Sequence, residues 1–215
     1  RMWRQGGEGA ITVRKPQRAR FIAMSTQGRA MAVRRDLGRG LEVLTLPQDT
    51  IYGVVLDHGG TLPLPGLRGL SCATFCMDGV TLVESNDLGV AALWDSAKAK
   101  LLDSRRWNQA AMVLGPGAGD SIRAVMADGS LIEVPMNGDA LRTLVPASTT
   151  SVWTLAAISP DGRGAAWATS SPDLQHQCHL RVWWEGDKEA RQLTAERLSA
   201  IALHAGTRRV ALGLG

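Results

Sequence analysis

Residues 70–102 read LSCATFCMDGVTLVESNDLGVAALWDSAKAKLL, and this stretch decides the fold. Short apolar runs are separated here by two turns, Met77-Asp78-Gly79 and Asp87-Leu88-Gly89, and the run that follows the second turn ends in Trp94-Asp95. Short apolar runs bounded by glycine, aspartate and asparagine are typical of β-strands. The stretch therefore predicts a set of antiparallel strands that are joined by tight turns.

The same arrangement recurs along the whole chain. A turn that ends in glycine follows an apolar strand at Gly28, Gly79, Gly119, Gly162 and Gly206, at intervals of 51, 40, 43 and 44 residues. A second landmark, a strand followed by a polar step, keeps pace with the first around Leu44, Trp94, Pro135 and Trp183. A period of about 40–45 residues is that of a four-stranded propeller blade.

The segment 70–102 resembles a WD-repeat blade over its whole length. Trp94-Asp95 stands where that family has its signature dipeptide. Ser159-Pro160-Asp161-Gly162-Arg163 fully matches the family's turn between its first two strands, and Leu180–Trp184 is similar to its third strand. The resemblance covers the chain, most strongly in these two blades, and implies a WD-repeat-like β-propeller. PDGR-type turns of this kind are also found in TolB-like propellers.

One position of the family pattern has no match. In well-formed WD-repeat blades, a histidine ahead of the first strand links the turn aspartate, a serine or threonine, and the signature tryptophan by hydrogen bonds. Asp87, Ser85 and Trp94 match three of these members, but the nearest histidine, His58, lies twelve residues ahead of Leu70. The resemblance therefore leaves this hydrogen-bond network incomplete in the blade.

We expect a single all-β domain over residues 1–215, a β-propeller of four-stranded antiparallel blades that forms part of a larger ring. Full blades are expected at about 18–52, 66–104, 108–146 and 151–194, with partial blades at 1–17 and 197–215. The partial blades are complementary halves, so closure into a five-bladed ring is the alternative. Trp94 and Trp183 are large enough to fill the space between blades.

Composition and charge argue against several classes of protein. The net charge is +4, but the basic residues are mostly scattered among acidic ones, so nucleic-acid binding is not expected. No apolar run approaches the roughly 18 residues of a membrane span. The three cysteines match no zinc spacing, and Cys72 and Cys76 lie too far apart on an extended strand for a disulfide. Free thiols predict a reducing, cytoplasmic location.

No catalytic, cofactor or metal site is expected. The run 115–119 is glycine-rich, but no helix pattern follows it as in a phosphate-binding loop. Gly119-Asp120-Ser121-Ile122 is similar to a short esterase motif, yet it falls on a repeat turn. His176-Gln177-Cys178-His179 offers two imidazoles and a thiol, but a closed metal site needs further ligands. We interpret it as a polar loop.

The predicted function is a protein-interaction scaffold or sensor propeller, as one module of a larger bacterial signalling protein. Resemblance to WD-repeat proteins implies protein partners. The candidate partner-binding residues are Trp107, Arg105 and Arg106, because an indole on a ring face beside two cations is typical of a binding hot spot. The alternatives are the propeller domain of a prolyl-oligopeptidase-like serine hydrolase and a periplasmic TolB-like binding protein.

Overall fold

The computed structural model describes residues 2–3, 10–11, 19–25, 30–35, 41–45, 61–64, 70–148, 153–170, 177–196 and 198–214. These residues form β-strands and their connections, and their single helical element is a 3-10 turn at Ala205–Thr207. Four four-stranded sheets follow one another along the chain, with a two-stranded sheet before and after them. The predicted all-β propeller of four full and two partial blades is confirmed in the described residues.

The blades are formed by strands that are consecutive in the chain. The N-terminal partial blade contains β1 (Met2–Trp3) and β2 (Ala10–Ile11). The first blade contains β3 (Ala19–Met24), β4 (Ala30–Arg35), β5 (Leu41–Thr45) and β6 (Thr61–Leu64). The second blade contains β7 (Leu70–Phe75), β8 (Thr81–Asn86), β9 (Val90–Asp95) and β10 (Lys100–Arg106).

The second half of the chain repeats this order. The third blade contains β11 (Ala111–Pro116), β12 (Ser121–Met126), β13 (Leu131–Pro135) and β14 (Arg142–Val145). The fourth blade contains β15 (Trp153–Ile158), β16 (Gly164–Ser170), β17 (Gln177–Trp184) and β18 (Arg191–Glu196). The C-terminal partial blade contains β19 (Leu198–His204) and β20 (Arg209–Leu214).

The first blade is longer than expected. Its fourth strand is β6, so the blade reaches Leu64 and passes the boundary near residue 52 that the sequence suggested. The interval between Gly28 and Gly79 is 51 residues long, and it already contains the extra residues of this blade. They lie between the third and fourth strands of the blade, whereas the sequence interpretation placed them between two blades.

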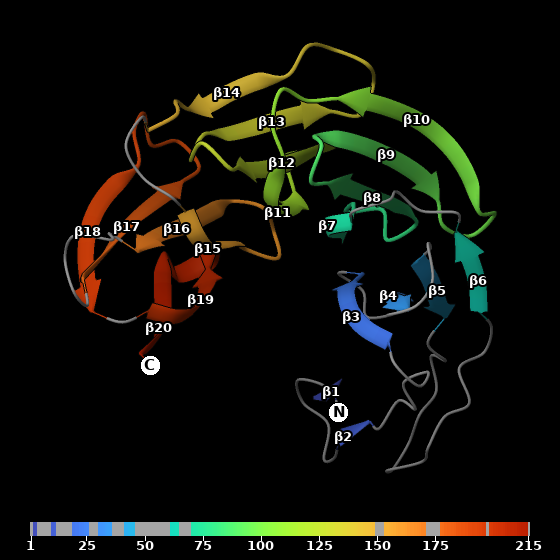
Figure 1. The fold of residues 1–215 in the computed structure, drawn as a ribbon, viewed down its shortest axis with the longest axis horizontal. Helices are drawn as coiled ribbons and strands as arrows, with labels where there is room; N and C mark the ends of the chain where they lie inside the picture. Colours follow the sequence, from blue (N-terminus) through green and yellow to red (C-terminus); the bar gives the residue numbers. More distant parts are fainter. Residues whose placement is uncertain are drawn as a thin grey trace.

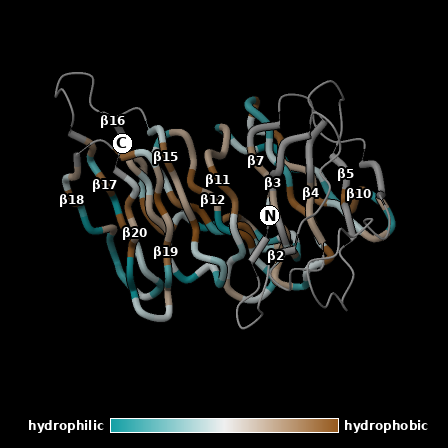
Figure 2. The backbone as a smooth tube through the Cα atoms, turned by 90° about the horizontal axis from the view of Figure 1, so that it is seen from below, coloured by the Kyte–Doolittle hydropathy of each residue, from teal (hydrophilic) through white to brown (hydrophobic). Residues whose placement is uncertain are grey.

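The sheets are arranged around an arc, as Figure 1 shows. The first strand of each blade lies at its inner edge, because β3 contacts β7, β7 contacts β11, β11 contacts β15, and β15 contacts β19. The fourth strands, β10, β14 and β18, lie on the outer side (Figure 1). In Figure 2, hydrophobic segments lie along the strands and hydrophilic ones gather at many of the connections.

Antiparallel order places the connections at two opposite ends of the blades. We call one end the hairpin face; it carries the turns 76–80, 96–99, 117–120, 136–141, 159–163 and 185–190. We call the other end the linker face; it carries the turns 87–89 and 127–130 and the connections 107–110 and 146–148. Function in such folds is usually carried by these connecting loops.

The turn 159–163 shows why its residues are needed. The Ser159 hydroxyl donates to Asp161 Oδ1 at 2.7 Å, and the Gly164 N–H donates to the Ser159 hydroxyl at 2.8 Å. Gly162 has a φ of +72°, a region that favours glycine, and an added Cβ would lie 2.1 Å from the Pro116 carbonyl oxygen. The turn therefore closes tightly against the third blade.

Tryptophans fill the spaces between blades, as predicted. Trp94 is 6% exposed and packs with apolar residues of the first blade, including Val43. Trp183 is 4% exposed and packs with apolar residues of the third blade, including Val125. Burial of a large apolar side chain contributes about 1.5–3 kcal/mol to stability.

Candidate functional site

Trp94 has a hydrogen-bond partner that the WD-repeat pattern does not supply. Its indole N–H donates to Glu84 Oε1 at 2.8 Å, and Glu84 is completely buried on the neighbouring strand β8. The Ser85 hydroxyl donates to the Asn86 carbonyl oxygen at 3.5 Å, and Asp87 is exposed. Glu84 therefore serves as the acceptor for the signature indole.

Trp107 follows β10 on the linker face, but its side chain is not exposed there. Its backbone N–H donates to the Gly89 carbonyl oxygen at 2.7 Å. Its indole is 4% exposed and belongs to the apolar core between the second and third blades. The expectation of an indole on the ring surface is wrong, because the third blade covers the apolar ring. A role of Trp107 in partner binding stays a prediction.

Arg105 and Arg106 do not flank the indole together, because neighbouring residues of a strand point to opposite sides. Arg105 Nε donates to Asp103 Oδ2 at 2.7 Å, and its Nη1 donates to the Pro135 carbonyl oxygen at 2.8 Å. Arg105 thus joins the second blade to the third. Arg106 is exposed. Partner binding by either arginine also stays a prediction.

A pocket of about 310 Å³, which we call the linker-face pocket, lies between the connection 107–109 and the third blade, and it extends along β14 to Leu141. Trp107, Met126 and Ile132 contribute apolar wall, and Leu141 and Pro146 lie at its exposed side. The Leu141 side chain is 49% exposed. The pocket is therefore an apolar depression with a buried base and an accessible leucine.

Polar contacts hold the rim of this linker-face pocket. Gln109 Nε2, in the connection 107–110, donates to Asp128 Oδ2 of the third blade at 2.7 Å. The backbone N–H and the hydroxyl of Ser130 both donate to Asp128 Oδ1, at 2.9 and 2.7 Å. Both carboxylate oxygens of Asp128 are thus engaged, so the pocket is preformed by the fold.

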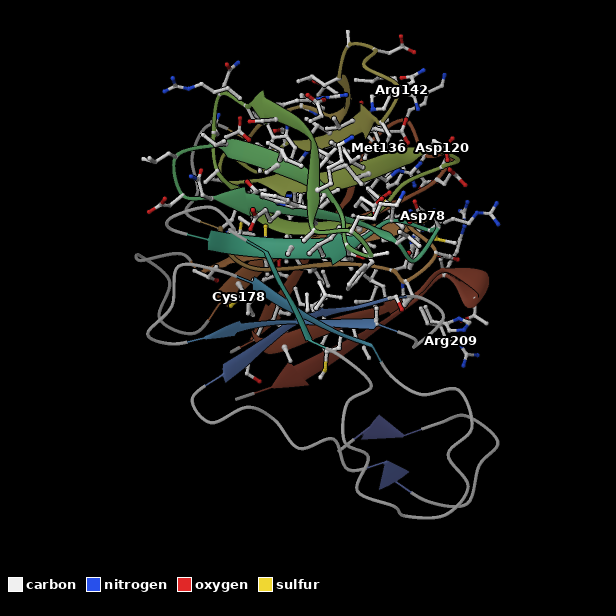
Figure 3. The ribbon with its side chains drawn as sticks, turned by 90° about the vertical axis from the view of Figure 1, so that its right-hand side faces the viewer. Asp78, Asp120, Met136, Arg142, Cys178 and Arg209 are labelled. Atoms are coloured by element: carbon white, nitrogen blue, oxygen red, sulfur yellow. The ribbon has the colours of Figure 1, made fainter. Side chains whose placement is uncertain are left out.

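A second pocket, also of about 310 Å³, opens on the hairpin face between the second and third blades. Its lining includes three sulfur-containing residues and two acids: Cys76, Met77, Met136, Asp78 and Asp120. Figure 3 shows Asp78, Asp120 and Met136 gathered on one side of the molecule. The Met136 N–H donates to the Asp120 carbonyl oxygen at 2.8 Å, which holds two connections of the third blade together.

The ionisation of this hairpin-face pocket follows from its contacts. Partial burial acts to raise the pKa of Asp78, but hydrogen bonds from the Thr81 hydroxyl and from the Thr81 and Val80 N–H groups outweigh it and lower the pKa. Burial raises the pKa of Cys76 to about 12, and the charges of Asp78 and Asp120 add to the effect. At neutral pH the pocket therefore contains a carboxylate beside a protonated thiol.

A buried ion network joins the third and fourth blades. Arg123 is 2% exposed; its Nη2 lies 3.0 Å from Glu133 Oε1 and 2.9 Å from Glu185 Oε1, and its Nη1 donates to the Gly162 carbonyl oxygen. The Arg123 guanidinium also lies 4.9 Å from the centre of the Trp183 ring. The arrangement is a structural tie, because Arg123 of the third blade binds Glu185 and the Gly162 carbonyl oxygen of the fourth blade.

Two exposed arginines extend the network. Arg142 pairs with the second oxygen of Glu133, and Arg163 Nε lies 2.8 Å from Glu185 Oε2. Hydrogen bonds from Arg123 and then Arg163 lower the pKa of Glu185. No pattern in the sequence indicates this network, because its members are isolated charged residues far apart in the chain.

The other motifs do not form a site in the described residues. The Ser121 hydroxyl of the esterase-like motif donates to the Ala118 carbonyl oxygen at 2.7 Å. Cys178 is buried and His179 is exposed, so the two point to opposite sides of β17; His176 lies outside the described residues. No group of three metal-ligating side chains was found in the described ranges. No helix there is long and apolar enough for a membrane crossing.

Comparison with known proteins supports the fold. No protein-family model matches the sequence, and no curated protein matches it. The chain is similar in structure to the hydrazine synthase of Kuenenia stuttgartiensis, with a TM-score of 0.64 and 10% identity over 84% of this chain and 50% of that one. It is also similar to the β-propeller domain of Cps50 (Swd1) from Myceliophteria thermophila, with a TM-score of 0.61 and 12% identity over 91% of this chain and 65% of that one. The chain spans between half and two thirds of these structures, and at this identity the likeness shows a β-propeller fold alone.

Proposed function

We propose that this propeller is a protein-interaction module, a scaffold or sensor within a larger cytoplasmic signalling protein, and that it is not itself an enzyme. The linker-face pocket is the observation that carries this proposal. It combines a preformed apolar base with an exposed leucine, and apolar anchors that enter such pockets supply much of the affinity of protein interfaces. The occupant would be an apolar side chain of a partner protein.

The geometry of the pocket supports a protein ligand. Its volume, about 310 Å³, is at the low end for small-molecule sites and suits one large side chain. Its rim is already held by Gln109, Asp128 and Ser130, so little ordering cost accompanies binding. The three described cysteines are free thiols, which agrees with a reducing compartment.

The alternative functions rest on one feature, the Ser159–Arg163 turn. Turns of this type also occur in the propeller domains of prolyl-oligopeptidase-like hydrolases and in TolB-like binding proteins. In the first case the catalytic residues would lie in another domain, and in the second the protein would be periplasmic. Both alternatives keep the propeller as a binding surface.

Affinity capture from the source cells tests the proposal, with the chain as bait and quantitative mass spectrometry as readout. We expect Leu141→Arg to reduce capture of the specific partner at least tenfold, because it places a charge at the mouth of the apolar pocket. Leu193→Arg is the matched control, since Leu193 is 52% exposed and lies on the outer strand β18. The captured protein is then purified and its Kd measured for both variants. Equal binding by both, or capture of no specific protein, would overturn the proposal.

A further inference from the structure

We propose that the hairpin-face pocket binds a basic side chain, lysine or arginine, of a partner protein. The proposal extends the proposed function to a second surface and depends on it only in that the ligand belongs to a protein. Its elements are a pocket between two blades, two carboxylates that no cation of the described residues neutralises, and a sulfur-rich apolar wall.

The charge of the pocket is uncompensated. Asp78 binds only neutral donors: its Oδ1 accepts the N–H groups of Val80 and Thr81 at 2.9 and 2.8 Å, and its Oδ2 accepts the Thr81 hydroxyl at 2.6 Å. Asp120 is exposed, and within the described residues its carboxylate has neither a hydrogen bond nor an ion pair. The two carboxylates therefore present negative charge that a cationic ligand complements.

The wall of the pocket suits the aliphatic part of such a ligand. Met77 is 44% exposed and Met136 is partly buried, so both thioethers are accessible from the pocket. Methionine side chains are flexible and polarizable and adapt to the shape of a ligand. Lysine and arginine place their methylene stems on apolar surface and keep their charged ends at polar groups. The arrangement of thioethers and carboxylates matches this division.

The base of the pocket supplies an independent observation. Cys76 lines the pocket and is only 7% exposed, and its thiol has no hydrogen-bond partner among the residues described. Asp78 and Asp120 line the same pocket as this thiol, and their charges add to the rise of its pKa. A thiol sulfur is a weak acceptor, and an ammonium or guanidinium group would provide the donor that it lacks.

A divalent cation fits the pocket less well. Calcium takes about six to eight oxygen ligands, whereas the described residues supply no group of three metal-ligating side chains here. Both oxygens of Asp78 are also already engaged by the turn. A pocket of about 310 Å³ is also larger than one ion requires and is the right size for one extended side chain.

Methyl NMR of the full chain, labelled with ¹³C at its methionine methyl groups, tests this proposal. The probes are acetyl-Gly-Lys-Gly-amide, its arginine counterpart, and acetyl-Gly-norleucine-Gly-amide, which keeps an aliphatic side chain and lacks the charge. We expect the two cationic peptides to shift the Met77 and Met136 signals saturably, with Met→Leu variants giving the assignments. The norleucine peptide should bind at least tenfold more weakly.

Two variants decide whether the carboxylates are responsible. Asp120→Asn should weaken the binding of the lysine peptide at least fivefold without loss of thermal stability, because the Asp120 carboxylate has no partner in the described residues. Asp87→Asn, at an exposed turn on the linker face, removes the same charge and should leave binding unchanged. Equal binding of the norleucine peptide, no effect of Asp120→Asn, an equal effect of Asp87→Asn, or saturation of the same signals by calcium alone would overturn the proposal. Leu141→Arg separates the two proposals: if this variant captures the partner as well as the unchanged chain does and still binds the lysine peptide, the linker-face proposal falls and this one stands.

Discussion

Replacement of Arg123 by alanine is the sharpest test of how the blades are held together. Arg123 is 2% exposed, and its removal leaves Glu133, with a side chain 9% exposed, paired only with the exposed Arg142. Breaking a buried ion pair by removing one partner costs about 3–5 kcal/mol, because a charge remains buried without compensation. For a chain of this length, each kcal/mol lowers Tm by about 2–4 °C, so the expected loss is about 6–20 °C.

The measurement is urea-induced unfolding at pH 7, followed by tryptophan fluorescence and by circular dichroism. Arg163→Ala is the matched control: it removes an arginine from the same network, but Arg163 is 68% exposed and its pair with Glu185 contributes about 0–1 kcal/mol. The double variant Arg123→Met, Glu133→Leu should recover much of the lost stability, because an apolar pair replaces the buried charges. The network would not be the tie that we describe if Arg123→Ala lowered the free energy of unfolding no more than Arg163→Ala does. The same would follow if the free-energy change of the double variant equalled the sum of the changes for Arg123→Met and Glu133→Leu alone.

Three further predictions concern turns, pH and thiols. Gly162→Ala should destabilise the chain by at least about 2 kcal/mol in urea unfolding, because the added methyl group meets the backbone of the third blade. Gly186→Ala is the control: its φ is +89° and no atom lies near its Cβ, so it should cost only the backbone strain of about 1–2 kcal/mol. The pKa of Glu185 is lowered from 4.5, chiefly by the hydrogen bond from Arg123, so its contribution to the free energy of unfolding is present above pH 4.5 and is lost as the pH falls through the lower native pKa. Glu185→Gln should therefore flatten the acid side of the stability profile, measured by thermal melts between pH 3 and 6. Burial raises the pKa of Cys76 to about 12, so Ellman's reagent at pH 8 should modify this thiol at least 100-fold more slowly in the native chain than in urea, with the labelled residue identified by mass spectrometry.

The blade architecture was accessible from the sequence because it depends on local chemistry. The Ser159–Arg163 turn needs a serine, an aspartate and a glycine at fixed positions, and the structure uses each of them as the pattern implies. Trp94 and Trp183 lie between blades, where their large apolar rings pack against residues of the neighbouring blade. The pattern predicts too short a first blade, because its fourth strand, β6, follows a long insertion and has no landmark of its own.

The sites were less accessible because they depend on which blades are neighbours. Trp107 stands beside two arginines in the sequence and was expected to be exposed, but the third blade covers it. The hairpin-face pocket brings together the turn at Asp78 and the turn at Asp120, which lie one repeat apart. Aligning the repeats against one another would have placed these turns side by side, but it would not have shown the cavity between them.

Both pockets lie beside the packed core that joins the second and third blades, and this core explains why a rigid fold suits the proposed function. On the linker face Gln109 binds Asp128, and Arg105 reaches the Pro135 carbonyl oxygen from β10. Residues of both blades line the hairpin-face pocket, whereas the connection between the blades and the third blade line the linker-face pocket, so a shift of one blade against the other alters both pockets. The apolar core that includes Trp107 resists such a shift, because its side chains are already close-packed. The buried indole therefore helps to keep both pockets in shape, and its apolar ring is also part of the wall of the linker-face pocket.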